Sequence, residues 1–308
     1  MNSIESEAPQ KPRRNYKLKS RKYEKYIPAV FTLAASVSII TTVGIVLTLF
    51  NDAWHFFRAV PLQDVFSTEL APLAAEPKFG FIPLITGTAL TSLIAMLVAT
   101  PVGLTAAIYM SQFANDQVRK VIKPIIELLA GIPTIVYGFF AYSFVTPLLT
   151  LLIPTLEAKN VLSPGIVMGI MIIPLVTSLS EDAMSSVPEA IREAALGLGS
   201  TKLEASIQVV LPAALSGVIA SIVLGISRAV GETMIVAIAS GSSKRFTLDV
   251  TQSIQTMTGY IVEFTSGDAG SGTIGYYSLY AVGLILFAFT LILNMTAQYI
   301  SRKFREAY

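Results

Sequence analysis

Cysteine is absent from the 308-residue sequence, and histidine occurs once, at His55. Without cysteine, the chain has no disulfide framework, no cysteine-ligated metal and no thiol chemistry. A single histidine also excludes metal sites built from several histidines. Charge is scarce too, because Asp, Glu, Lys and Arg make up 14% of the residues, whereas a soluble domain carries about 25%. These absences argue against an ordinary cytosolic enzyme.

Apolar residues fill most of the sequence, and 53% of the chain is hydrophobic. Because the hydrocarbon core of a bilayer is about 30 Å thick and a helix rises about 1.5 Å per residue, a spanning helix needs about 20 mostly apolar residues. Segments of this kind occupy residues 27–50, 82–110, 125–151, 164–180, 211–240 and 278–300. The sequence therefore predicts an all-α membrane protein with six transmembrane helices.

The basic residues are distributed unevenly between the two sides of this arrangement. The first 25 residues hold eight Lys and Arg, and that side of the membrane carries 16 in total. The opposite side carries five, with the intramembrane Arg228 left out of both counts. Lys and Arg concentrate in cytoplasmic loops, so we expect both termini to be cytoplasmic. The predicted organisation is a basic tail over 1–25, a transmembrane domain over 26–305 and a short tail end over 306–308.

The loop between the fourth and fifth segments, residues 181–210, has the local chemistry of a helix, a turn and a second helix. Ser186 and Glu189 have the spacing of a capping box, and Gly199 suits the left-handed position after a helix. Thr201 and Glu204 offer a second capping box. The sequence predicts a short cytoplasmic helix over about 188–199.

Small residues lie next to charges on this predicted helix. Ala194 and Ala195 follow Glu193, and a smooth face of this kind can dock into a groove of another protein. A solvated connection between two membrane segments is the plainer alternative. A pattern that extends beyond this helix favours docking. Glu193-Ala-Ala is followed after three residues by Gly199, and after nine more by Val209-x-Leu211-Pro212. This spacing resembles the EAA motif of permease subunits of ABC importers, with Val209 in place of the usual Ile.

The resemblance implies that the helix over 188–199 is a coupling helix that contacts a separate ATPase. The residues of this helix and of the motif that would serve this contact are Glu189, Glu193, Ala194, Ala195, Gly199, Leu211 and Pro212. The sequence contains no G-x-x-x-x-G-K-S/T element, so it cannot bind ATP through a P-loop of its own. We expect no cofactor, no metal site and no catalytic residue in this subunit, with ATP and magnesium bound by a partner ATPase.

Two ionisable residues fall within the fifth apolar segment. Arg228 and Glu232 are four residues apart, so a continuous helix puts them on one face. Charges at membrane depth usually face a cavity or pair with each other, and an Arg guanidinium can bind phosphate through its planar set of donors. We expect Glu232 to neutralise Arg228 when the site is empty, and Ser227 and Thr233 to face the same cavity. An ion pair that only stabilises the helix bundle is the alternative.

Two further stretches narrow the resemblance to one group of importers. They are Leu129-Ala-Gly-Ile-Pro-Thr-Ile-Val-Tyr-Gly-Phe139 and Arg228-Ala-Val-Gly-Glu232-Thr233-Met234. Together with Glu181-Asp182 they resemble the permease subunits of the bacterial phosphate-specific ABC importer, over residues 26–305. The long first outward loop and the basic tail are similar to the first of its two permeases. In that family, the positions that match Arg228 and Glu232 are important for transport.

This resemblance implies a type I importer permease (MetI-like) fold, with spans two to six as the core and span one against a partner. The implied partners are a second, homologous permease, two ATPase subunits, an extracytoplasmic phosphate-binding protein, phosphate and membrane lipids, without nucleic acid. The implied location is the bacterial plasma membrane. The expected function is ATP-driven phosphate import by alternating access. A permease for sulfate or molybdate, and an ATP-independent secondary transporter with an inverted repeat, are the alternatives.

Overall fold

The structure, a computed structural model, describes residues 26–268, 270 and 272–303, so the predicted tails 1–25 and 306–308 lie outside it. Its contacts divide the chain into two units, Met1–Thr48 and Leu49–Tyr308. Helix α2 (Ile27–Ala59) begins in the first unit and ends in the second. The described part of the first unit is thus the amino-terminal part of one apolar helix.

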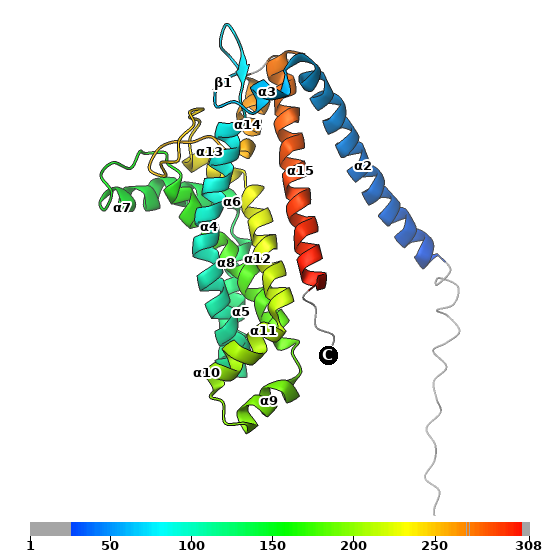
Figure 1. Cartoon of the computed structure of the whole chain (residues 1–308), viewed down its shortest axis with the longest axis vertical. Coiled ribbons are helices and arrows are strands. Elements are labelled where there is room, and N and C mark those ends of the chain that lie inside the picture. The colour runs from blue at the N-terminus through cyan, green and yellow to red at the C-terminus, as the bar shows by residue number, and fades with distance from the viewer. Residues whose placement is uncertain (1–25, 269, 271, 304–308) are drawn as a thin grey trace, which may run out of the picture. The chain divides into compact units, whose positions relative to one another are not determined.

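The second unit is mainly helical (Figure 1). Its longer helices are α4 (Ile82–Ile108), α5 (Asp116–Gly131), α8 (Leu162–Ser185), α9 (Glu189–Gly197), α12 (Leu215–Val230) and α15 (Ile274–Lys303). Its shorter helices are α3 (Leu62–Val65), α6 (Thr134–Phe140), α7 (Thr146–Thr150), α10 (Lys202–Glu204), α11 (Leu211–Ala213), α13 (Met234–Ala239) and α14 (Met257–Glu263). π-helical turns occupy η1 (Tyr109–Phe113), η2 (Ala141–Val145), η3 (Ala205–Val210) and η4 (Phe264–Asp268). Strands β1 (Leu70–Ala71) and β2 (Lys78–Phe79) pair antiparallel, with Leu70 opposite Phe79.

Six spans result only if two bent helix pairs each count as one. Four helices are long and apolar enough on their own: α2, α4 with η1, α8 and α15. The predicted span 125–151 is bent by 87° between α5 and α6, where Pro133 cannot continue a helix, and the pair over 202–230 is bent by 74°. The predicted span 164–180 is longer than expected, because α8 runs from Leu162 to Ser185.

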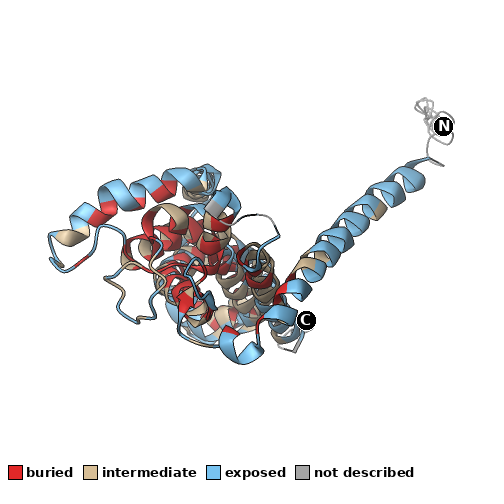
Figure 2. Cartoon of the chain, turned by 90° about the horizontal axis from the view of Figure 1, so that it is seen from above, coloured by how far each residue is buried: buried red, intermediate tan, exposed pale blue. Residues whose placement is uncertain are grey.

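Helices α4 and α8 form the centre of the second unit. Gly165 and Gly169 lie one turn apart on α8, and a Cβ atom at Gly169 would come within 2.7 Å of the Ala95 carbonyl oxygen on α4. Small residues at this spacing let two helix backbones approach closely. Met168 and Ile172 of α8 are fully buried in the cluster that surrounds this contact. Figure 2 shows the buried residues gathered inside the packed helices.

The two ends of the second unit are built differently. Helix α9, with α10 and α11, lies at one end, while α3, β1 and α14 lie at the other (Figure 1). At the second end, Phe56, Phe81 and Tyr260 are fully buried in one aromatic cluster. The predicted cytoplasmic loop 181–210 and the long first outward loop are therefore at opposite ends, as a membrane-spanning arrangement requires.

Candidate functional site

Helix α9 begins without the first predicted capping box. Its N-cap is Pro188, which has no side-chain acceptor, and the Ser186 hydroxyl instead donates to the Ala183 carbonyl oxygen at 2.7 Å. The predicted capping box of Ser186 and Glu189 was wrong because Ser186 is the C-cap of α8. Its N–H donates to the Asp182 carbonyl oxygen. Residues 186–188 serve as a short connection between α8 and α9.

The other end of α9 agrees with the sequence prediction. Gly199 has a φ of +93°, the left-handed conformation that glycine adopts readily. Its N–H donates to the Leu196 carbonyl oxygen at 3.0 Å, and the Ser200 N–H donates to that of Ala195 at 3.2 Å. These two bonds make a Schellman motif, which ends the helix and satisfies its last carbonyl groups.

The second predicted capping box is also present. The Glu204 N–H donates to the Thr201 hydroxyl at 3.3 Å, and the Thr201 N–H donates to the Glu204 carboxylate at 2.8 Å. The backbone bond from Thr201, with a second bond from its hydroxyl, lowers the pKa of Glu204. The chain after Gly199 is thus held by local bonds.

The exposed surface of α9 differs in part from the one expected. Glu189, Glu193 and Ala194 are exposed, but Ala195 is buried. Ala194 and Ala195 therefore do not share a docking face, because neighbouring residues of a helix point in different directions. Leu198 is 89% exposed at the end of α9. Sequence reasoning missed this residue, although an apolar side chain within the predicted docking segment was a visible signal.

Two further residues of the EAA-like motif follow η3. Leu211 is half-buried and Pro212 is exposed, both in the short helix α11. Leu211 packs beside a buried cluster that contains Met184, Val210 and Val218. The motif thus joins the loop of α9 to the base of α12.

The second candidate site has a different geometry from the one predicted. Helix α12 ends at Val230, and Glu232 lies in the break before α13. Glu232 and Arg228 are therefore not on one face of a continuous helix. The Glu232 Oε1 atom accepts the N–H groups of Met234 at 3.1 Å and Ile235 at 3.4 Å, the first residues of α13.

Arg228 has no carboxylate within 4.0 Å among the described residues, so the expected ion pair with Glu232 is not formed. Its side chain is exposed, and its Nη2 atom lies 4.0 Å from the Met171 sulfur. The arrangement leaves guanidinium donors available for an anion, because Glu232 is engaged by the backbone of α13. A guanidinium can hold an oxyanion through two parallel bonds.

The hydroxyl groups of Ser227 and Thr233, which were expected to face one cavity, bond to different partners. Ser227 donates to the Oδ1 atom of Asn294 on α15 at 3.0 Å, whereas Thr233 donates to the Gly231 carbonyl oxygen at 3.3 Å. Asn294 was missed, although an amide within the apolar segment 278–300 is itself a polar signal at membrane depth. Asn294 also lines a cavity of about 630 Å³ with Ser221 and Gln298.

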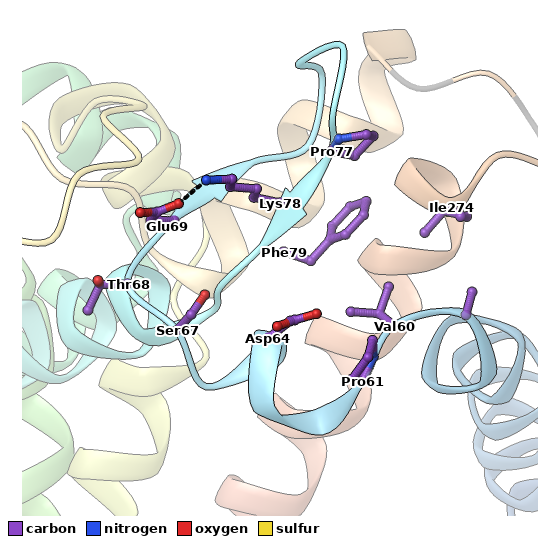
Figure 3. A pocket seen from close by; sticks show the side chains of 11 residues that line it. Val60, Pro61, Asp64, Ser67, Thr68, Glu69, Pro77, Lys78, Phe79 and Ile274 are labelled. Carbon is purple, nitrogen blue, oxygen red and sulfur yellow. Dashed lines mark hydrogen bonds and ion pairs between the residues drawn. The ribbon is translucent and has the colours of Figure 1, made fainter.

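A separate pocket of about 540 Å³ lies beside the hairpin at the opposite end from α9 (Figure 3). Its polar wall includes Asp64 and the ion pair between Glu69 and Lys78. None of the predicted site residues lines this pocket. It marks the end of the molecule where the predicted outward loop folds into short strands.

Comparisons with known proteins agree with these features. Residues 99–306 match the family described as binding-protein-dependent transport system inner membrane component. A phosphate transport system permease protein PstC of Xylella fastidiosa (strain 9a5c) is 34% identical over 304 residues, 91% of each chain. A probable ABC transporter permease protein, YqgH of Bacillus subtilis (strain 168), is 30% identical over 277 residues, 89% of each chain.

Solved structures share the fold at low sequence identity. A bacterial alginate ABC transporter, solved with an alginate pentasaccharide-bound periplasmic protein, matches with a TM-score of 0.63 at 15% identity, over 93% of this chain and 99% of that chain. An inward-facing MetNI methionine ABC transporter matches with a TM-score of 0.55 at 15% identity, over 74% of this chain and 95% of that chain. The predicted MetI-like permease fold is confirmed, and the chain belongs to the family of inner membrane components of binding-protein-dependent transport systems.

Proposed function

We propose that this chain is the permease subunit of an ATP-driven ABC importer that carries inorganic phosphate across the bacterial plasma membrane. The observation that carries the proposal is the 34% identity to a phosphate transport permease over 91% of both chains. The chain changes no bond in its substrate, so its work is to form a path and to open it alternately to the two sides.

The ATPase would dock at α9. Glu189, Glu193 and Leu198 are exposed there, which gives an apolar tip beside two carboxylates. The Schellman motif at Gly199 fixes the end of the helix, so α9 can move as one body. ATP and magnesium would bind the ATPase subunits, and this permease would need no cofactor of its own.

The substrate path would pass Arg228. Its exposed guanidinium has no acidic partner among the described residues, and Ser227 lies next to it at the end of α12. Glu232 would influence the path through its charge, while its oxygen caps α13. An anion that reaches Arg228 therefore does not have to displace a bound carboxylate.

The complete importer would contain a second, homologous permease, two ATPase subunits and an extracytoplasmic phosphate-binding protein. Both termini of this chain would be cytoplasmic, and α9 would lie on the same side. ATP binding would draw the two ATPase subunits together and displace α9, which would turn the path outward. Hydrolysis would return the path to the cytoplasmic side.

Uptake of labelled phosphate tests the proposal in vesicles that contain the whole complex. We expect ATP-dependent uptake that resists excess sulfate and molybdate. Arg228→Ala should lower uptake by about 30-fold or more, because loss of a charged partner costs about 2 kcal/mol or more. Arg58→Ala is the matched control, since Arg58 stacks over the Trp54 ring at the outer end and should leave uptake unchanged.

Other outcomes would redirect the proposal. Competition by sulfate or molybdate would move the substrate to another oxyanion. Uptake without ATP would overturn the importer mechanism. Equal uptake by Arg228→Ala and the parent chain would remove Arg228 from the path.

A further inference from the structure

Glu181 is a fully buried carboxylate in the last turns of α8. Two basic side chains from α5 reach it: Arg119 forms an ion pair with its Oε1 atom, and the Lys123 ammonium lies 3.0 Å from its Oε2 atom. Lys123 also lies 3.5 Å from Asp182. Removing a carboxylate from water is costly unless opposite charges compensate it, so this cluster ties α5 to α8 at one point.

The cluster sits where the predicted coupling helix joins the membrane core. Helix α8 ends at Ser185 and α9 begins at Glu189, so only residues 186–188 lie between them. The Ser186 and Val187 N–H groups bond the carbonyl oxygens of Asp182 and Met184, which keeps this connection short. A displacement of α9 therefore acts directly on the turn of α8 that carries Glu181.

Arg119 lies next to the start of α9 as well as to Glu181. It lines a crevice of about 220 Å³ together with Ser185, Glu189 and Arg192. The Ser185 hydroxyl lies 3.4 Å from the Glu181 Oε1 atom. The start of α9 and the start of α5 thus share one polar region around Glu181.

The other end of α5 is linked to the second candidate site. Across the 87° bend, the Tyr137 hydroxyl on α6 donates to the Leu129 carbonyl oxygen on α5 at 2.7 Å, which braces the bend. Helix α6 then packs closely on α13, because a Cβ atom at Gly138 would come within 3.1 Å of the Met234 carbonyl oxygen. Met234 is one of the residues whose N–H is held by Glu232.

We propose that Glu181, Arg119 and Lys123 form a coupling clamp. They are positioning residues that pass a displacement of α9 to α5, and through the braced bend to α6, α13 and Glu232. The inference rests on the proposed function, since it assigns a route for the ATP-driven movement. These three residues act without contacting ATP or phosphate.

The test compares two rates in vesicles that contain the whole importer, with its partner permease, ATPase and binding protein. Labelled phosphate uptake and ATP hydrolysis are measured on the same sample. Glu181→Gln keeps the shape of the side chain and removes its charge. We expect the phosphate carried per ATP to fall by about tenfold, a usual size for coupling between sites, while ATP hydrolysis continues. Lys123→Gln, which leaves Arg119 on Glu181, should lower the same ratio less.

Tyr137→Phe tests the route away from the clamp, because it removes only the hydroxyl bond to Leu129. It should also lower the ratio, and the double variant with Glu181→Gln should be no worse than Glu181→Gln alone. Residues that act in one route give such non-additive effects. Glu69→Gln is the control, since it makes the same substitution at a carboxylate that pairs with a lysine in the exposed hairpin, and it should leave the ratio unchanged.

An unchanged ratio in Glu181→Gln and Tyr137→Phe would overturn the clamp, even if less complex assembled. Strictly additive losses in the double variant would overturn the shared route. If Glu181→Gln does not assemble, Lys123→Gln and Tyr137→Phe decide the question. A parent complex that carries sulfate in place of phosphate would overturn the proposed substrate alone, and the ratio measured with sulfate would still decide the clamp.

Discussion

Two buried carboxylates are stabilised in different ways. Glu181 is fully buried and held by the side chains of Arg119 and Lys123, which come from another helix. Glu232 is nearly as buried, but its oxygen accepts backbone N–H groups at the start of α13. The side-chain partners of Glu181 join helix α5 to helix α8, whereas the backbone partners of Glu232 fix the start of helix α13.

This difference has a consequence for the nearby cations. Arg119 and Lys123 are committed to a carboxylate, while Arg228 has none within ion-pair distance in the described chain. With Asp182, which lies 3.5 Å from Lys123, the cluster holds two carboxylates and two cations. A cluster with balanced charge suits a rigid connection between two helices, because it does not attract outside ions. A guanidinium without a carboxylate partner suits an anion path. Substitutions at these charged residues separate the two roles.

The largest effect is expected from removing both cations of the clamp. Arg119→Ala with Lys123→Ala leaves Glu181 buried without a compensating charge, which should cost about 3–5 kcal/mol of stability. Both side chains are about one-third exposed, at 37% and 32%, so water could reduce the loss toward the lower figure. The thermal unfolding midpoint of the purified complex measures it.

Lys120→Ala is the matched control for this double variant. Lys120 lies between the clamp residues on α5, is exposed and forms no ion pair within the described residues. Its removal should leave the unfolding midpoint unchanged. An equal decrease in Lys120→Ala and in the double variant would mean that general charge on α5, not the clamp, sets the stability.

A smaller change in stability is expected at Glu232, where two substitutions separate the cap from the charge. Glu232→Ala removes the acceptor for α13 and should cost about 1 kcal/mol, the usual value of a helix cap. Glu232→Gln keeps an acceptor oxygen, so the unfolding midpoint should stay near that of the parent chain. Because Gln lacks the negative charge, we expect it to lose most phosphate uptake. Full uptake by Glu232→Gln would mean that Glu232 only caps α13 and that its charge has no role in transport.

The residues around the end of α9 show what could be predicted from the sequence alone. Gly199 and the Thr201–Glu204 capping box were predicted correctly because their bonds reach only three to five residues along the chain. The family was predictable from the spacing between Glu193 and Pro212, which needs no knowledge of packing.

Long-range contacts account for what the sequence did not predict. Glu232 was expected to continue the helix of Arg228, but α12 ends at Val230, and α13, which packs on α6 at Gly138, begins only at Met234. The clamp joins residues about 60 positions apart, at 62 for Arg119 and 58 for Lys123. No local pattern in one sequence indicates which of many cations will meet a given carboxylate.

The smallest effect is expected at a third carboxylate, the exposed Glu69 of the hairpin. Its hydrogen bond and ion pair with Lys78 lower its pKa. A lowered pKa means that the pair stabilises the folded chain above the ordinary Glu pKa, and that this contribution is lost as the pH falls through the lowered value. Solvent screens exposed pairs strongly, so Glu69→Gln should change the unfolding midpoint very little at neutral pH.

Comparing the parent chain with Glu69→Gln across acidic pH completes this test. Any small difference at neutral pH should disappear once the pH is below the lowered pKa of Glu69, because the parent side chain is then also neutral. In 1 M salt the neutral-pH difference should shrink too, since the Debye length is then only about 3 Å. A difference that persists in acid and in salt would mean that Glu69 stabilises the hairpin by packing, so that only the buried carboxylates owe their role to charge.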